Sequence, residues 1–149
     1  MIPPAVPDDH QEETMSVQDI LRTHPRPLIA DVAVLARCLD ECGVCEASCT
    51  ICADACLAED DVSDLVRCIR LCLDCADACT GAMRILGRQT DPHPPTQLNM
   101  LEACLAACRA CADECERHAA HHEHCRLSAE ECRRCEQACE QLRSALSRP

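Results

Sequence analysis

Small and aliphatic side chains recur at steps of three and four residues along four stretches of this chain, and charged residues fill the positions between them. Residues three and four apart lie on one face of an α-helix, so the pattern predicts amphipathic helices with one face turned inward. Polar, Pro-rich or Gly-containing segments separate the stretches. We therefore expect four long helices, over residues 28–57, from about 63 to 86, from about 96 to 122 and from about 125 to 144.

Local signals indicate how these helices begin and end. An acidic turn follows the first helix, and Asp61 or Ser63 is expected to cap the second, because both side chains can accept hydrogen bonds from backbone N–H groups. Gly87 is expected to end that helix. The segment TDPHPP breaks the chain before Thr96, which is the expected cap of the third helix.

The N-terminal part of the chain predicts only one short element. Ser16 and Asp19 have the spacing of a capping box, which favours a short helix over residues 17–23 that ends at the following His-Pro-Arg-Pro segment. Residues 1–15 are acidic and rich in proline, and we expect them to be disordered. Residues 16–149 are expected to form a single domain.

The connections between the long helices are short, which favours antiparallel neighbours. The fold class predicted is therefore all-α: an up-down-up-down four-helix bundle with a short N-terminal helix and a core lined by cysteine. A helical solenoid is the alternative, but four units of unequal length with inward side chains close more naturally as a bundle.

Cysteine dominates the inward positions. The chain has 18 cysteines among 149 residues, and they follow one another in four runs at steps of four and three. In the fourth run, Ser128 stands where a further cysteine would fall. Each helix is therefore predicted to direct a stripe of thiols toward the bundle axis. The runs are Cys38, Cys42, Cys45, Cys49, Cys52 and Cys56; Cys68, Cys72, Cys75 and Cys79; Cys104, Cys108, Cys111 and Cys115; and Cys125, Cys132, Cys135 and Cys139.

Because neighbouring helices alternate in direction, their residues can be aligned level by level. One terminal level is predicted to contain Cys38, Cys79, Cys104 and Cys139. Continuing the repeats beyond this level gives Leu35, Leu86, Leu101 and Leu142. Continuing them beyond the opposite level gives Asp61, Leu65, His118, His122 and Cys125. The bundle is thus expected to be closed by leucines at one end and to have a polar opening at the other.

The histidines and methionines near the two ends have competing interpretations. His118 and His122 continue the thiol stripe of the third helix, which favours them as metal ligands over residues of a solvated turn. His121 and His124 are expected to be solvated. Met83 and Met100 lie four residues from the last thiol of their helices and are candidate ligands, although a flexible methionine also fills gaps at helix ends.

Composition narrows the class of partner. The formal net charge is −12, which disfavours binding to nucleic acid or to anionic membranes. The chain has no Phe, Tyr or Trp, so the usual bulky core residues are missing. The first 15 residues lack the features of a signal peptide, and no apolar run is long enough to span a bilayer. We expect a cytosolic protein, whose cysteines stay reduced and bind metal.

Thiolates at this spacing favour Cu(I). Two thiolates one helical turn apart can converge on one ion, and a facing helix can add a third. Soft thiolates bind Cu(I), zinc or iron-sulfur clusters. Zinc takes four thiolates per ion and would leave a heavy negative charge inside the bundle, and iron-sulfur clusters need loop-borne cysteines. Replacing each thiol proton by Cu(I) leaves the core neutral, which predicts about 18 ions per chain.

The four in-phase runs of C-x3-C and C-x2-C, with no aromatic residue and no export signal, resemble the cytosolic branch of the bacterial copper storage proteins. The resemblance covers about residues 16–145. It implies a four-helix bundle that stores Cu(I), assembles as a homotetramer and is not an enzyme. It also implies that all 18 cysteines bind copper and that Asp61, His118 and His122 lie at the opening. A small-molecule thiol or a copper chaperone is the expected donor.

Three other functions remain alternatives. A general buffer for zinc or cadmium would bind about four ions per chain. A thiol or iron-sulfur redox protein would need an exposed thiol of low pKa in a basic setting, which the acidic sequence does not suggest. A bundle stapled by disulfides would show no free thiols, and neighbouring cysteines on one helix are poorly directed for such bonds.

Overall fold

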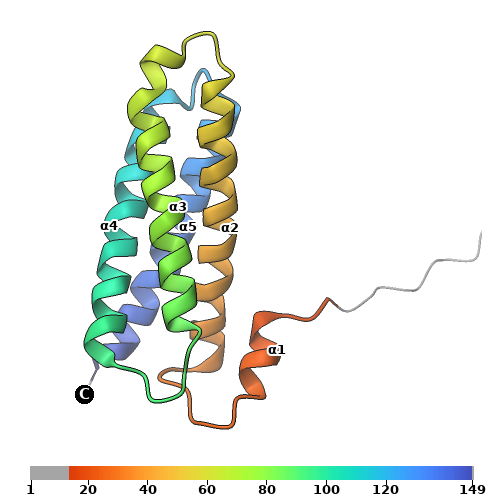
Figure 1. Ribbon diagram of the computed structural model, residues 1–149, viewed down its shortest axis with the longest axis vertical. Helices are drawn as coiled ribbons and strands as arrows, with labels where there is room; N and C mark the ends of the chain where they lie inside the picture. Colours follow the sequence, from red (N-terminus) through yellow and green to blue (C-terminus); the bar gives the residue numbers. More distant parts are fainter. Residues whose placement is uncertain (1–13, 149) are drawn as a thin grey trace, which may run out of the picture.

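The four long helices form an antiparallel bundle, as predicted. A computed structural model describes residues 14–148 of the chain, and within this range it is helical without any strand. Neighbouring long helices run in opposite directions, and each packs against two others, so that α2–α3–α4–α5 closes into a ring (Figure 1). The elements are α1 (Val17–Arg22), α2 (Val32–Leu57), the 3-10 helix η1 (Val62–Leu65), α3 (Val66–Leu86), α4 (Pro94–His118) and α5 (Glu123–Leu146).

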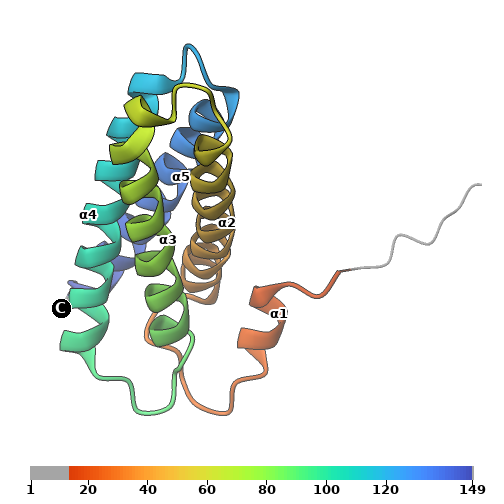
Figure 2. The ribbon, with the colours of Figure 1, turned by 45° about the horizontal axis from the view of Figure 1, so that its top comes forward.

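The short helix α1 begins as the sequence predicts. The Ser16 hydroxyl accepts a hydrogen bond from the Asp19 N–H at 3.2 Å, and the Asp19 carboxylate accepts one from the Ser16 N–H at 3.2 Å. Leu21 is buried, and α1 lies against α2 outside the ring of long helices (Figure 2). The expected disorder of residues 1–15 concerns mainly residues 1–13, which lie outside the described residues.

The first long helix begins four residues later than predicted. It starts at Val32 instead of residue 28, because the Asp31 side chain caps it by accepting hydrogen bonds from the N–H groups of Ala33 and Val34. Its end at Leu57 agrees with the prediction. The Asp31 carboxylate was not among the expected caps, since the apolar pattern already begins upstream of it.

The predicted caps of the second long helix are wrong. Neither Asp61 nor Ser63 makes a side-chain cap, and a turn of 3-10 helix leads directly into α3. The Asp61 carboxylate instead lies 3.0 Å from Nε2 of His122, which is far away in the sequence. The helix ends at Leu86 with Gly87 in the C-cap position, as predicted.

The third and fourth helices also differ from the predicted bounds. Thr96 is not the cap: α4 begins at Pro94, because proline fits the first turn of a helix. The Thr96 hydroxyl instead lies 2.8 Å from Nδ1 of His93. The helix ends at His118, not at residue 122, because the chain turns over residues 119–122 before α5 begins.

The two ends of the bundle differ as expected. At the end that faces α1, four leucine side chains are completely buried and close the core: Leu35, Leu86, Leu101 and Leu142. Gln89 ties two loops together there, since its amide accepts a hydrogen bond from the Ile29 N–H at 2.9 Å and donates one to the Leu86 carbonyl at 2.7 Å. The opposite end carries the α2–α3 and α4–α5 connections.

Ion pairs cover the outer face between α4 and α5. Arg133 lies 2.6 Å from Asp113 and 3.0 Å from Glu116, and Arg109 lies 2.9 Å from Glu136. Each exposed pair contributes only about 0–1 kcal/mol, so the series fixes the register of the two helices more than it stabilises them. None of the described helices is long and apolar enough to cross a membrane.

Candidate metal centre

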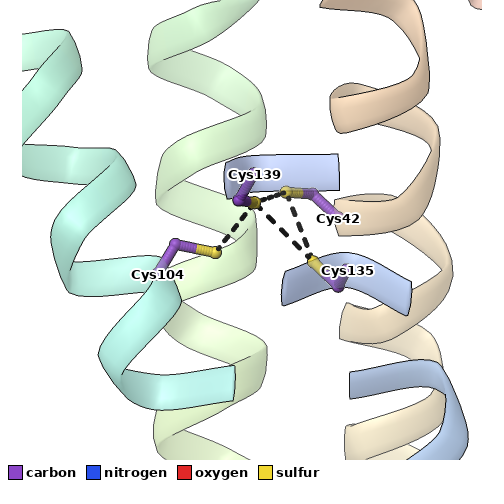
Figure 3. Close-up of side chains that lie close together, drawn as sticks. All are labelled: Cys42, Cys104, Cys135 and Cys139. Carbon is purple, nitrogen blue, oxygen red and sulfur yellow. Dashed lines mark hydrogen bonds between the residues drawn. The ribbon is translucent and has the colours of Figure 1, made fainter. Parts of the chain in front are cut away.

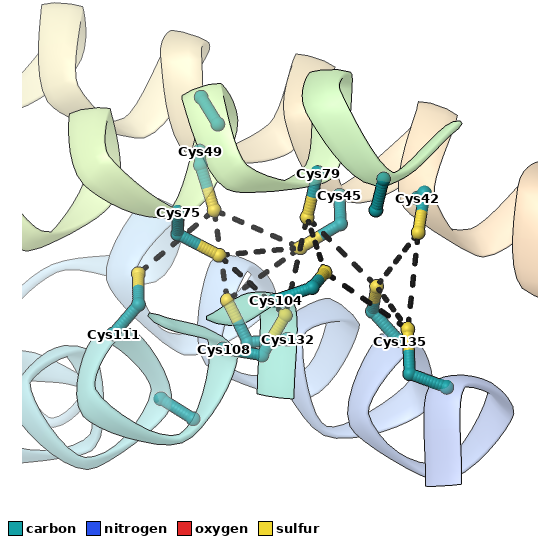
Figure 4. Close-up of a cluster of buried hydrophobic side chains, with 14 of the residues drawn as sticks. Cys42, Cys45, Cys49, Cys75, Cys79, Cys104, Cys108, Cys111, Cys132 and Cys135 are labelled. Atoms are coloured by element: carbon teal, nitrogen blue, oxygen red, sulfur yellow. Dashed lines mark hydrogen bonds between the residues drawn. The ribbon is translucent and has the colours of Figure 1, made fainter. Parts of the chain in front are cut away.

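The interior of the bundle is a continuous column of thiols. All 18 cysteines are free and buried. Sulfur atoms of neighbouring cysteines lie between 3.5 and 4.0 Å apart, both along one helix and between helices. Figure 4 shows the middle of this column, where side chains from all four long helices point toward one another. The predicted convergence of four stripes on one axis is confirmed.

The predicted alignment of levels is also confirmed. At the leucine-closed end, Cys38 Sγ lies 3.7 Å from Cys139 Sγ, and Cys139 Sγ lies 3.9 Å from Cys104 Sγ. Cys79 Sγ completes the level at 3.8 Å from Cys104 Sγ. These four residues come from four different helices, so the antiparallel register was readable from the cysteine steps alone.

Groups of four sulfur atoms along the column are close enough to share an ion. One such group, Cys42, Cys104, Cys135 and Cys139, combines thiols from α2, α4 and α5 (Figure 3). Neighbouring groups share members: Cys135 belongs to this group and to the next, and Cys45 belongs to that next group and to the one after it. Because the groups overlap, separate tetrahedral ions could not fill all of them at once, whereas ions that share bridging thiolates could.

Ser128 takes the place of a cysteine in the stripe of α5, and it stays in the core. Its side chain is buried, and Oγ lies 3.8 Å from Cys49 Sγ. On the opposite side of the same level, Cys49 Sγ lies 3.8 Å from Cys111 Sγ, and Cys111 Sγ lies 3.6 Å from Cys72 Sγ. The sulfur path therefore continues past the hydroxyl through α3 and α4.

Carboxylates hold two imidazoles at the end opposite the leucines. His122 Nε2 lies 3.0 Å from the Asp61 carboxylate, and its Nδ1 lies 3.3 Å from Glu59. The hydrogen bond to Asp61 and the nearby charges raise the pKa of His122 and lower that of Asp61. His118 Nε2 lies 3.2 Å from the buried Glu114. The structure thus brings Asp61 and His122 together at this end, as predicted, and pairs His118 with Glu114.

His124 was wrongly expected to be solvated. Its Nδ1 lies 3.4 Å from Cys52 Sγ and 3.6 Å from Cys125 Sγ, while its Nε2 lies 3.0 Å from Glu59. His124, Cys52, Cys56 and Cys125 form a group whose ligand atoms all lie within 4.8 Å of one another. Burial opposes the charged ring, but the contacts with Cys52 and Glu59 raise the pKa of His124. Its position directly before Cys125 was the available signal.

The remaining candidates lie in different surroundings. His121 is exposed, as expected. Met83 and Met100 pack between helices against glycines: a Cβ atom on Gly43 would lie 3.5 Å from Met83 Sδ, and one on Gly81 would lie 3.4 Å from Met100 Sδ. Both methionine side chains therefore fill the notches that two glycines leave in neighbouring helices.

The outermost thiol of α2 keeps its proton at neutral pH in the metal-free protein. Burial and the neighbouring Cys52 raise the pKa of Cys56, the outermost thiol of α2, to about 11. A thiol must lose its proton when it binds a metal ion. Metal uptake by this core therefore exchanges protons for cations.

Comparison with known proteins relates this core to a described family. A sequence model of the family described as copper storage protein matches residues 31–144. This range contains every cysteine of the chain. The comparison with curated proteins finds no match.

Solved structures with the same fold come from Streptomyces lividans. The copper storage protein Ccsp loaded with 10 copper equivalents is 49% identical, with a TM-score of 0.86 over 88% of this chain and 100% of that chain. A structure described as copper loading to a cytosolic copper storage protein, with five coppers, is 50% identical, with a TM-score of 0.76 over 77% of this chain and 96% of that chain. A variant of Ccsp with two histidines replaced by alanine is 48% identical, with a TM-score of 0.78 over 79% and 99%.

Proposed function

The chain belongs to the copper storage protein family, and we propose that it is a cytosolic store that sequesters many Cu(I) ions inside its helical bundle. The observation that carries this proposal is the unbroken series of buried, free thiols with sulfur separations of 3.5–4.0 Å. The cytosolic location is supported by the 50% identical Streptomyces lividans protein, which is described as cytosolic.

The ligands we propose are the 18 cysteines, with imidazole added at the open end. Buried thiolates that each bridge two Cu(I) ions balance the charge of the metal, so the column can fill without burying net charge. His124 joins the thiols because its Nδ1 faces Cys52 and Cys125. The packing of Met83 and Met100 against glycines favours a structural role for these two residues.

The number of bound ions tests this function. We expect anaerobically reduced protein to bind about 18 Cu(I) ions per chain, because each thiol proton is replaced by one cation. Since the chain has no Trp or Tyr, near-ultraviolet absorption reports copper-thiolate bonds almost without background. Saturation at four or five ions, or a preference for zinc at matched free metal, would instead indicate the zinc buffer.

The open end is the route that we propose for copper delivered along the axis. His118 and His122 continue the thiol stripe of α4 in the sequence, and imidazole nitrogen is a ligand that suits copper. Asp61 and Glu59 orient the His122 ring, since a second-shell carboxylate fixes the direction of an imidazole ligand. The carboxylates are hard ligands and attract the ion without storing it.

Paired histidine variants test this route. Replacing His118 and His122 together by Leu is expected to slow both loading and chelator-driven removal, while the total capacity changes by only about an ion or two. The exposed His121, replaced in the same way, serves as the control and should leave both rates at the parent values. Stopped-flow absorption in the near ultraviolet measures these rates. Equal rates in the parent and the double variant would place the route elsewhere.

Assembly and donor complete the proposal. The resemblance of the four cysteine runs to the family implies a homotetramer, and sedimentation of the metal-free protein measures the oligomeric state.

The donor that we propose is a small-molecule thiol or a copper chaperone, because Cu(I) must arrive on a soft ligand. We propose no catalytic role: storage needs binding groups but no substrate cleft.

A further inference from the structure

A small pocket opens into the side of the bundle, close to the end that carries Asp61 and His122. It lies between α2 and α5, has a volume of about 180 Å³ and is lined by Ser48, Ile51, Cys52, His124 and Leu127. A pocket of this size holds about six water molecules, at about 30 Å³ for each. It therefore accepts a molecule of a few non-hydrogen atoms but not a peptide or a protein.

Two metal-binding groups form the inner wall of this pocket. Cys52 is 1% exposed, whereas the other 17 cysteines have no exposed surface. The His124 side chain is 22% exposed, and its Nδ1 lies 3.4 Å from Cys52 Sγ. Both belong to the outermost group of candidate ligands, with Cys56 and Cys125. A molecule in the pocket would thus touch the coordination sphere of an ion held there.

The rest of the pocket favours an uncharged ligand over an anionic one. Ile51 and Leu127 form its rim and are 66% and 50% exposed, which leaves two large apolar side chains facing solvent beside the thiol column. No arginine or lysine lines the pocket. Glu59 lies against the outer nitrogen of His124, and the chain carries a net charge of −12. An anionic ligand is therefore repelled, whereas a small uncharged one loses little hydration on this surface.

We propose that this pocket is a docking site for a small uncharged thiol, through which Cu(I) is exchanged with the column from the side. The proposal rests on the proposed copper storage and adds a second route to it. An incoming complex of Cu(I) with a thiolate places its metal between Cys52 and His124. The Cys52 Sγ–Cu bond forms, the bond from Cu to the carrier thiolate breaks, and one proton given up by the hydrogen-bonded cysteines passes to the departing sulfur. Copper remains Cu(I), and the carrier leaves as a neutral thiol.

Variants of the pocket wall test the site without touching a metal ligand. Ser48→Leu fills the pocket, and Leu127→Ala widens it at an exposed position where the fold tolerates the change. Leu73→Ala, at a 46% exposed position on α3, is the matched control. Reduced protein is mixed with Cu(I) carried either by 2-mercaptoethanol, which is small and uncharged, or by glutathione, which is larger and anionic. Stopped-flow absorption gives the loading rate, and the bound-copper number gives the capacity.

We expect Ser48→Leu to slow loading from 2-mercaptoethanol about tenfold, since an overfilled site must open before the ligand enters. Leu127→Ala should accelerate this loading, and Leu73→Ala should match the parent. Loading from glutathione should be the same in all four proteins. The inference is overturned if Ser48→Leu and Leu127→Ala load from 2-mercaptoethanol at the parent rate, or if Ser48→Leu slows both donors equally. A parent capacity of only a few ions would instead overturn the storage function.

Discussion

Carboxylates and imidazoles at the open end work as pairs. Asp61 and Glu59 both lie within 3.3 Å of His122, and Glu59 also holds the outer nitrogen of His124. One carboxylate thus orients two rings, whose centres lie 5.5 Å apart. Glu59 and Asp61 come from the α2–α3 connection, and both histidines come from the start of α5. The pairs therefore link the two connections at this end of the bundle.

Glu131 is a buried acid outside the thiol column. Its side chain is 5% exposed, and Oε2 accepts a hydrogen bond from Arg134 at 2.8 Å. Oε1 has no hydrogen-bond partner among the described residues. Burial and the neighbouring carboxyl of Glu41 raise the pKa of Glu131 to about 8. The folded protein therefore holds a proton there at neutral pH that the unfolded chain releases.

This proton makes stability depend on pH in a definite direction. An acid whose pKa is higher in the folded state lowers the free energy of unfolding as pH rises from its ordinary value of 4.5 toward about 8. Glu131→Gln removes this loss, so the metal-free variant should be more stable than the parent at pH 7.5 by about 1–2 kcal/mol and nearly equal to it at pH 4. Urea unfolding of reduced protein at the two pH values measures the difference. A variant that is less stable at pH 7.5 would show that the carboxylate is charged and well paired.

At the scale of the helices, the sequence predicted what repeats and missed what depends on distant partners. The steps of four and three placed all four thiol stripes, the level of Cys38 and Cys139, and the leucine-closed end, because a helical period is a local property. The sequence pattern also predicted correctly that α2 ends at Leu57. The caps at Asp61 and Ser63 failed, since a carboxylate that caps in isolation can choose a partner 61 residues away, as Asp61 does with His122.

His124 illustrates the same limit. It lies outside the 3.5-residue repeat, so periodicity assigned it to solvent. After the turn over residues 119–122, the first turn of α5 places the ring beside Cys52. The direction of this turn depends on how α4 and α5 pack, so it cannot be predicted from the residues of the turn alone.

The caps that do form give a matched test at this scale. Asp31→Ala removes the hydrogen bonds to two N–H groups at the start of α2 and should destabilise the metal-free bundle by about 1 kcal/mol. Ser63→Ala, which removes a side chain that makes no cap, should change the stability by less than about 0.5 kcal/mol. Thermal unfolding followed by circular dichroism compares them. Equal losses would mean that Ser63 caps α3 in solution.

For the whole molecule, the prediction is that the bundle folds before it binds metal. The leucines at one end, the cysteines as small apolar side chains, and the ion pairs between α4 and α5 supply a core and a register without any ion. Circular dichroism of the reduced, metal-free protein should show a helical spectrum. Copper should then raise the unfolding temperature, because it binds only the folded form. A random-coil spectrum without metal would mean that copper builds the fold.

The leucine-closed end has a consequence for the order in which stored metal can be used. Both proposed routes reach the column near Cys52 and Cys56, whereas the level of Cys38 and Cys139 lies behind all other thiols and against leucine. Ions can then reach the deepest level only by displacement from thiol to thiol. A column that is open on one side behaves like a stack: the first ions to arrive are the last to leave. Copper bound most recently would therefore exchange first, and copper bound earlier would be released only after it.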